Sequence, residues 1–156
     1  MPSFFFFRKG GLDTYSEDFP GLVSVAAYLK QLGAQEHERK PTDAEGFLRE
    51  LDAVPWREVM AAWLVAQEGP LPALVLCSDD MKVQFGISGV FHEQLHYYQC
   101  SFSREVKKGW FSKETQNLSF EIHAREDVAG LVRQFVQGDY DALRDEARHI
   151  GLNVLG

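Results

Sequence analysis

The segment with the clearest potential for chemistry is the His-Glu-Gln-Leu-His sequence at residues 92–96. If this segment were a helix, His92 and His96 would lie one turn apart on one face, close enough to bind the same zinc ion. Glu93 would then stand beside the metal, where a carboxylate can act as general base for a metal-bound water. A helix here would therefore imply metal-assisted hydrolysis with zinc as the cofactor.

An extended strand would not allow this chemistry. Four residues of strand span roughly 13 Å, so two histidines on one face of a strand are too far apart to share an ion. The sequence favours the strand, because residues 96–103 contain no Ala, Leu, Lys or Glu, and Tyr98, Cys100 and Phe102 alternate with other residues. The helix is the alternative, because four residues also follow a helical spacing: Phe91, Leu95, Tyr98 and Phe102.

Over residues 92–96 the chain resembles the zincin family of metalloproteases, whose signature is His-Glu-x-x-His. The resemblance implies a small zinc-dependent metallohydrolase in which His92 and His96 bind the metal and Glu93 is the catalytic base. It extends no further, since Gln99 and Phe102 stand where the longer metzincin signature has Gly and His. A third ligand would have to come from another segment, and the candidates are Glu105, Glu114, Glu121 and His123.

Length and charge narrow the class of protein. With 156 residues, of which 45% are hydrophobic and 25% charged, the chain is expected to form a single domain over residues 1–156. The 23 acidic residues outnumber the 16 basic ones and give a net charge of −7. This charge argues against nucleic acid as the main ligand, because phosphate binding needs a basic surface. It suits either simple solubility or the binding of a basic protein.

The chain carries no stretch with the pattern of a membrane span or a signal peptide. Phe4 to Phe7 precede Arg8 and Lys9, whereas a signal peptide places its basic residues first and needs a longer apolar run. The first residues are therefore expected to be an apolar strand of a cytoplasmic protein. Cys77 and Cys100 lie in apolar stretches and are expected to be buried, reduced thiols.

Hydrophobic periodicity predicts helices, then strands, then helices again. Helical spacing covers residues 20–33, 42–51, 55–69, 128–136 and 139–151, with a capping box at Thr42 and Glu45 and an N-cap at Asp139. Strand-like patterns cover residues 73–77, 81–88 and 118–123. The predicted fold is α+β, with an antiparallel meander of about four to five strands in the middle of the chain, packed against N-terminal and C-terminal helices.

Residues 104–113 are locally basic and carry Trp110 and Phe111 at their expected tip. Exposed aromatic residues beside basic ones are typical of protein interfaces, so this loop is a candidate partner-binding element. Aromatic and basic side chains together can also contact single-stranded nucleic acid. The structural alternative is that Trp110 and Phe111 fold back to cover the sheet.

Acidic residues gather in three places: at Asp13, Glu17 and Asp18; at Asp79 and Asp80; and at Asp139, Asp141, Asp145 and Glu146. A basic protein surface could dock on any of these groups. The structural alternative is that they are solvated surfaces and helix N-terminal acids that complement the helix dipole.

These observations favour a non-catalytic, cytoplasmic protein-binding protein, expected to need no cofactor. Its size, acidity and lack of nucleotide or cofactor motifs suit a bacterial immunity protein or antitoxin-type inhibitor of a basic toxin or enzyme. The hypothesis assigns partner binding to seven residues: Asp79, Asp80, Trp110, Phe111, Asp139, Asp141 and Asp145. The alternative is the zinc metallohydrolase using residues 92–96.

Overall fold

A computed structural model of the chain describes residues 1–7, 39–66 and 71–156. The strands in these residues are β1 (Ser3–Phe7), β2 (Lys40–Pro41), β3 (Ala73–Cys77), β4 (Val83–His92), β5 (Leu95–Lys108), β6 (Ser112–Ile122) and β7 (Leu152–Leu155). The helices are α2 (Ala44–Ala53), α3 (Trp56–Ala66), α4 (Arg125–Val136) and α5 (Tyr140–Ile150). The helix predicted for residues 20–33 and the acidic residues Asp13, Glu17 and Asp18 lie outside the described residues.

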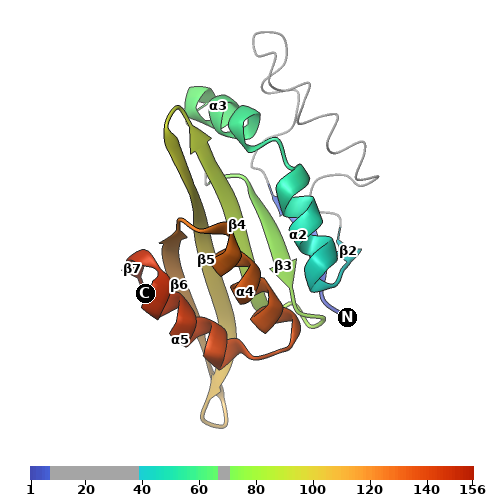
Figure 1. Ribbon diagram of the computed structural model, residues 1–156. Helices are drawn as coiled ribbons and strands as arrows, with labels where there is room; N and C mark the ends of the chain where they lie inside the picture. The colour runs from blue at the N-terminus through green and yellow to red at the C-terminus, as the bar shows by residue number, and fades with distance from the viewer. Residues whose placement is uncertain (8–38, 67–70) are drawn as a thin grey trace.

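All seven strands form one antiparallel sheet in the order β2-β1-β3-β4-β5-β6-β7. The α+β class and the central meander are confirmed, because β3 to β6 are consecutive neighbours in both the chain and the sheet (Figure 1). The sheet is wider than predicted: β2 and β7 add short strands at its two edges. The predicted strand at 81–88 starts later, because Met81 lies in the preceding turn with a φ of 63° and β4 begins at Val83.

One face of the sheet holds the hydrophobic core. Strand register places Phe4 opposite Leu76, and Phe85 opposite Phe102, so alternate residues of neighbouring strands share this face. The side chains on it are large and nearly inaccessible to solvent: Phe4, Phe6, Leu74, Leu76, Phe85, Ile87, Cys100, Phe102, Leu118, Phe120 and Ile122. Period-two alternation in the sequence therefore gives a sheet whose core face is almost entirely apolar.

The described helices cover this face. Helices α4 and α5 lie across it in Figure 1, with Leu131, Phe135 and Leu143 fully or almost fully buried. Helices α2 and α3 reach the same face at β1, where Phe4 meets Phe47 edge-on at 6.0 Å and Phe6 lies 6.5 Å from Trp56. None of the helices in the described residues has the length and apolar composition needed to cross a membrane.

Side-chain caps fix where two of the helices begin. The Asp139 carboxylate accepts a hydrogen bond from the Ala142 amide at 3.3 Å, as its position before α5 predicts. For α2 the capping residue is Asp43 rather than Thr42, and it accepts from the Gly46 amide at 2.7 Å. The predicted capping box is therefore wrong by one residue, because Asp and Thr are adjacent and compete for the same role.

The first turn of α3 packs directly on β4 because one strand residue has no side chain. A Cβ added at Gly89 would lie only 2.7 Å from Cδ1 and Cδ2 of the Trp56 indole, well inside van der Waals contact. The indole is 3% exposed, and its Nε1 donates to the Leu51 carbonyl at 2.9 Å. Gly89 thus allows Trp56 to join the end of α2, the start of α3 and the sheet.

We expect Gly89→Ala to lower the free energy of unfolding by about 1–3 kcal/mol, because the new methyl group overpacks a closed site. Urea denaturation followed by circular dichroism measures this change. The matched control is Gly130→Ala in α4, where an added Cβ meets nothing within 4 Å. This control should be neutral or stabilising by about 0.5–1 kcal/mol. Equal losses in both variants would contradict the packing role of Gly89.

Candidate functional site

The His-Glu-Gln-Leu-His segment is a β-hairpin and not a helix. Strand β4 ends at His92, β5 begins at Leu95, and the two residues between them form the turn, with Glu93 at a φ of 53°. The register pairs His92 with Leu95 and Phe91 with His96. The preference for extended structure at these residues is confirmed, with the addition of a chain reversal inside the motif.

This reversal separates the two histidines. Residues directly opposite one another in an antiparallel pair share a face, so His92 lies with Leu95 on one face and His96 with Phe91 on the other. The expectation that both histidines share a face of a strand is therefore wrong, because the chain turns between them. The helix that would place His92 and His96 beside one zinc ion, with Glu93 next to the metal, is therefore not formed. The metallohydrolase alternative loses the geometry on which its motif depends.

No other metal site replaces it in the part of the chain that the structure describes. Groups of three or more His, Cys, Asp or Glu side chains that could hold an ion are absent from these residues. All four candidate third ligands have other contacts: Glu105 pairs with Lys113 at 3.0 Å, Glu114 pairs with Lys108 at 3.6 Å, and Glu121 lies 3.5 Å from His123.

His96 instead helps to hold α3 against the hairpin. Its ring stacks on Phe91 with centroids 4.6 Å apart and planes inclined by 18°. The Arg57 guanidinium on α3 lies 2.6 Å from His96 Nε2, which accepts its hydrogen bond. Together with the Trp56–Gly89 contact, these interactions give the motif a structural role.

Trp110 and Phe111 occupy the tip of the opposite hairpin. Strand β5 ends at Lys108 and β6 begins at Ser112, and Gly109, with a φ of 82°, opens the loop between them. Trp110 is 96% exposed and Phe111 is 100% exposed. The alternative in which these rings fold back over the sheet is therefore wrong.

The rings stand away from the sheet because β5 and β6 extend beyond their neighbour. Val83, the first residue of β4, pairs with Arg104, so residues 105–115 form a two-stranded ribbon with no further β4 residue beside them. Cross-strand ion pairs join its strands, Lys113 to Glu105 at 3.0 Å and Lys108 to Glu114 at 3.6 Å. Figure 1 shows this ribbon projecting from one end of the molecule. We call residues 105–115 the ribbon.

The acidic residues predicted to bind a partner gather at the same end of the sheet. Asp79 and Asp80 lie in the β3–β4 turn, and Asp139 and Asp141 lie at the start of α5. Their proximity affects Tyr140: burial raises the pKa of its hydroxyl, and the charges of Asp80 and Asp79 raise it further. The fold thus unites two acidic groups that are far apart in the sequence.

Three of these acids have structural partners. Asp80 accepts hydrogen bonds from Ser78 Oγ at 2.8 Å and from the Lys82 amide at 3.0 Å, and these bonds lower the pKa of its carboxyl group. Asp79 pairs with the Met1 amino group at 2.7 Å, and Asp139 caps α5. Each of these three acids thus has a structural contact, and the Asp79 side chain is still 70% exposed.

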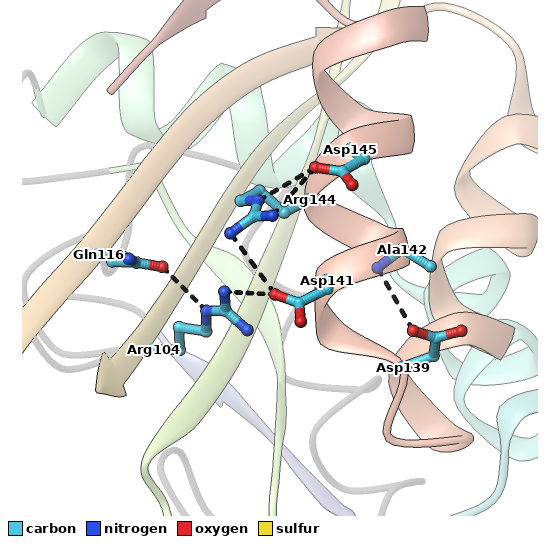
Figure 2. A network of polar contacts seen from close by, with 7 residues as sticks. All are labelled: Arg104, Gln116, Asp139, Asp141, Ala142, Arg144 and Asp145. Atoms are coloured by element: carbon cyan, nitrogen blue, oxygen red, sulfur yellow. Dashed lines mark hydrogen bonds and ion pairs between the residues drawn. The ribbon is translucent and has the colours of Figure 1, made fainter. Parts of the chain in front are cut away.

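The remaining two acids belong to the network in Figure 2. Arg104 donates to Asp141 at 2.6 Å and to Gln116 Oε1 at 3.0 Å, which joins α5 to β5 and β6. Arg144 lies 3.5 Å from Asp141 and 3.1 Å from Asp145. From the sequence, Arg104 is expected in a basic loop, and Arg144 has no predicted role. The strand alternation could have indicated the role of Arg104, because this residue lies two positions after Phe102 and therefore on the same face of β5.

The hydrogen bond from Arg104 is the main reason why the pKa of Asp141 lies below its ordinary value. We expect Arg104→Met to raise the pKa of Asp141, measured by ¹³C NMR titration of the carboxyl carbon. In the wild type this pair stabilises the fold above the unfolded-state pKa of about 3.9, and the contribution is lost as pH falls through the lower folded-state pKa.

The control for this titration is Lys113→Met on the ribbon, whose cation pairs with Glu105 rather than with Asp141. It should leave the titration of Asp141 unchanged. If Arg104→Met also leaves it unchanged, the network in Figure 2 does not exist in solution.

Comparison with protein families, with curated proteins and with solved structures finds no match for this chain. The evidence for its function therefore comes from the geometry of the ribbon and of the acidic residues at its base.

Proposed function

We propose that this chain is a non-catalytic protein-binding protein whose contact with its partner is anchored by Trp110 and Phe111. The observation that carries the proposal is the nearly complete exposure of two large aromatic rings at the tip of the ribbon. Burying such a ring at an interface contributes about 1.5–3 kcal/mol, and aromatic residues are typical anchors of protein complexes. Neither ring contributes to the core of the chain itself.

The form of the ribbon favours an inhibitor, of the kind represented by cytoplasmic bacterial immunity proteins and antitoxins. A narrow two-stranded projection with an apolar tip can enter a concave surface on a toxin or enzyme and block it. The acids at the base of the ribbon would attract a basic partner, because Asp79, Asp141 and Asp145 keep 70%, 71% and 69% of their side-chain surfaces exposed. The net charge of −7 would also attract a basic partner.

The proposal is tested by placing a photo-crosslinking amino acid at position 110 in the native host and identifying the captured protein. The purified partner is then used for binding and for inhibition of its own activity. We expect the wild-type chain to bind it and to inhibit it. A captured protein that neither binds the purified chain nor loses activity in its presence would contradict the inhibitor role.

We expect Trp110→Ala to raise the Kd for this partner by about 30-fold, or roughly 2 kcal/mol, because it removes an anchoring ring. The melting temperature should not change, since the ring is almost fully exposed. The control is Leu95→Ala, which removes an apolar side chain that is 56% exposed on the hairpin at the other end of β5. Unchanged binding by Trp110→Ala would show that the tip is not the anchor.

Neutralising Asp79 and Asp145 together, each to Asn, should lower the association rate about threefold to tenfold at low ionic strength, with a smaller effect at high salt. Surface plasmon resonance at two salt concentrations measures both rates. The control is Glu126→Gln, a neutralised carboxylate in the first turn of α4 with 83% of its side chain exposed. If the control slows association equally, net charge alone accounts for the effect.

A further inference from the structure

The outer edge of β6 is covered along only part of its length. On one side β6 pairs with β5 from Ser112 to Ile122. On the other side it pairs with β7 only at Ser119 and Glu121. Residues 112–118 therefore have one edge with no strand beside it among the residues that the structure describes.

Two observations show that backbone groups of β6 point out of this edge. The Glu105 amide donates to the Lys82 carbonyl at 3.0 Å, which turns Glu105 away from its opposite residue, Thr115. Thr115 is thus in a non-hydrogen-bonded pair, and its N–H and C=O face the open edge. Gly156, which follows β7, lies directly against the carbonyl oxygen of Asn117, so this carbonyl faces the same way and is already covered by the chain. By alternation, Lys113 faces this edge too.

A groove of about 480 Å³ runs along this edge, between β6 and α5. Phe102 and Leu118 lie beneath it, but they are only 2% and 4% exposed and present little surface of their own. Gln116 and Asn117 border it on the strand side, and Arg148 borders it on the helix side. The groove therefore combines an open backbone edge at Lys113 and Thr115 with a basic side chain, Arg148, on the opposite side.

The charge of Arg148 is not neutralised by any residue that the structure describes. Arg144 is held by Asp141 and Asp145, and Glu114, at the ribbon end of the groove, pairs with Lys108. Arg148 has no ion pair or hydrogen bond with any residue in the described ranges, and its side chain is exposed. A carboxylate entering the groove would therefore meet an unpaired guanidinium.

We propose that the open edge of β6 accepts an extended segment of a partner protein as an additional strand, with an acidic side chain of that segment on Arg148. The backbone groups of Lys113 and Thr115, with the N–H of Asn117, supply main-chain hydrogen bonds, and the groove supplies selectivity for side chains. Edge strands that are protected against pairing carry charges or proline along their length. Here Lys113 and Glu114 place charges at the ribbon end of the open edge, and the stretch from Thr115 to Leu118 carries neither charge nor proline. This inference is independent of the proposed role of Trp110.

The test uses synthetic peptides and the full ¹⁵N-labelled chain, followed by NMR. The probe is acetyl-Thr-Val-Glu-Val-Thr-amide, and its counterpart has Lys in place of Glu. We expect the Glu peptide to shift the amide signals of Lys113, Thr115 and Asn117. The Lys peptide should bind about tenfold more weakly, since it exchanges an ion pair for a like-charge contact.

Two variants and one modified peptide make the test specific. Thr115→Pro removes an amide that points out of the sheet, which an edge strand tolerates, and it should abolish the shifts while the fold is retained. Arg148→Glu should reverse the preference between the Glu and Lys peptides. A Glu peptide N-methylated at every residue should bind much more weakly, because neither of its edges keeps the amides needed for strand pairing.

Three results would overturn the proposal. One is the absence of amide shifts at Lys113, Thr115 and Asn117 with the Glu peptide. Another is equal binding of the N-methylated peptide, which would indicate side-chain contacts alone. The last is a concentration-dependent dimer that Thr115→Pro disrupts, which would assign the edge to a second copy of this chain. Trp110→Ala should retain the peptide response, so failure here and failure of the aromatic anchor are distinguishable.

Discussion

The structure depends on one face of the sheet being packed as a continuous layer of aromatic and aliphatic side chains. At its centre the ring centroid of Phe85 lies 6.3 Å from that of Phe120 and 6.5 Å from that of Phe135, so β4, β6 and α4 meet around one ring. This layer fixes the register of the central strands, because a slip of one residue would bring the other set of side chains into the core. With the register fixed, the positions of both hairpins follow. The short hairpin at 92–96 packs on α3, and the long hairpin extends past the end of β4.

The parts of the fold that could be predicted from the sequence are those set by local patterns. Alternation around Phe85 and Phe120 predicts strands, and Asp139 predicts the start of α5, because each signal lies within a few residues of the element it specifies. Strands β2 and β7 could not be predicted in this way. They are only two and four residues long, and they exist because distant strands offer them hydrogen bonds. A strand that forms through such pairing has little distinctive sequence pattern of its own.

The candidate site shows the same difference between features that a local sequence pattern predicts and features that depend on the fold. The five residues at 92–96 satisfy a zinc signature letter by letter, yet the fold places the two histidines on opposite faces of a hairpin. Trp110 and Phe111 can be identified from the sequence as aromatic residues in a basic loop. Their exposure, however, depends on where β4 begins, which is at Val83. The acids were identified by type, whereas their partners, Arg104 and Arg144, emerge only when α5 packs beside β5 and β6. The chemical type of each residue can be identified from the sequence, whereas the position of that residue relative to its partners depends on the whole fold.

The two-stranded construction of the ribbon has a dynamic consequence. A strand pair without a third strand or a covering helix is only marginally stable in water, so its opening is expected to cost much less free energy than unfolding the sheet. Its amides should therefore exchange with solvent faster than those of the same strands at Cys100 and Phe120, which lie in the core. A partner that binds Trp110 and Phe111 would slow this exchange, and part of the binding free energy would be used to order the ribbon. Affinity would then respond to substitutions that stiffen residues 105–115 without touching the partner.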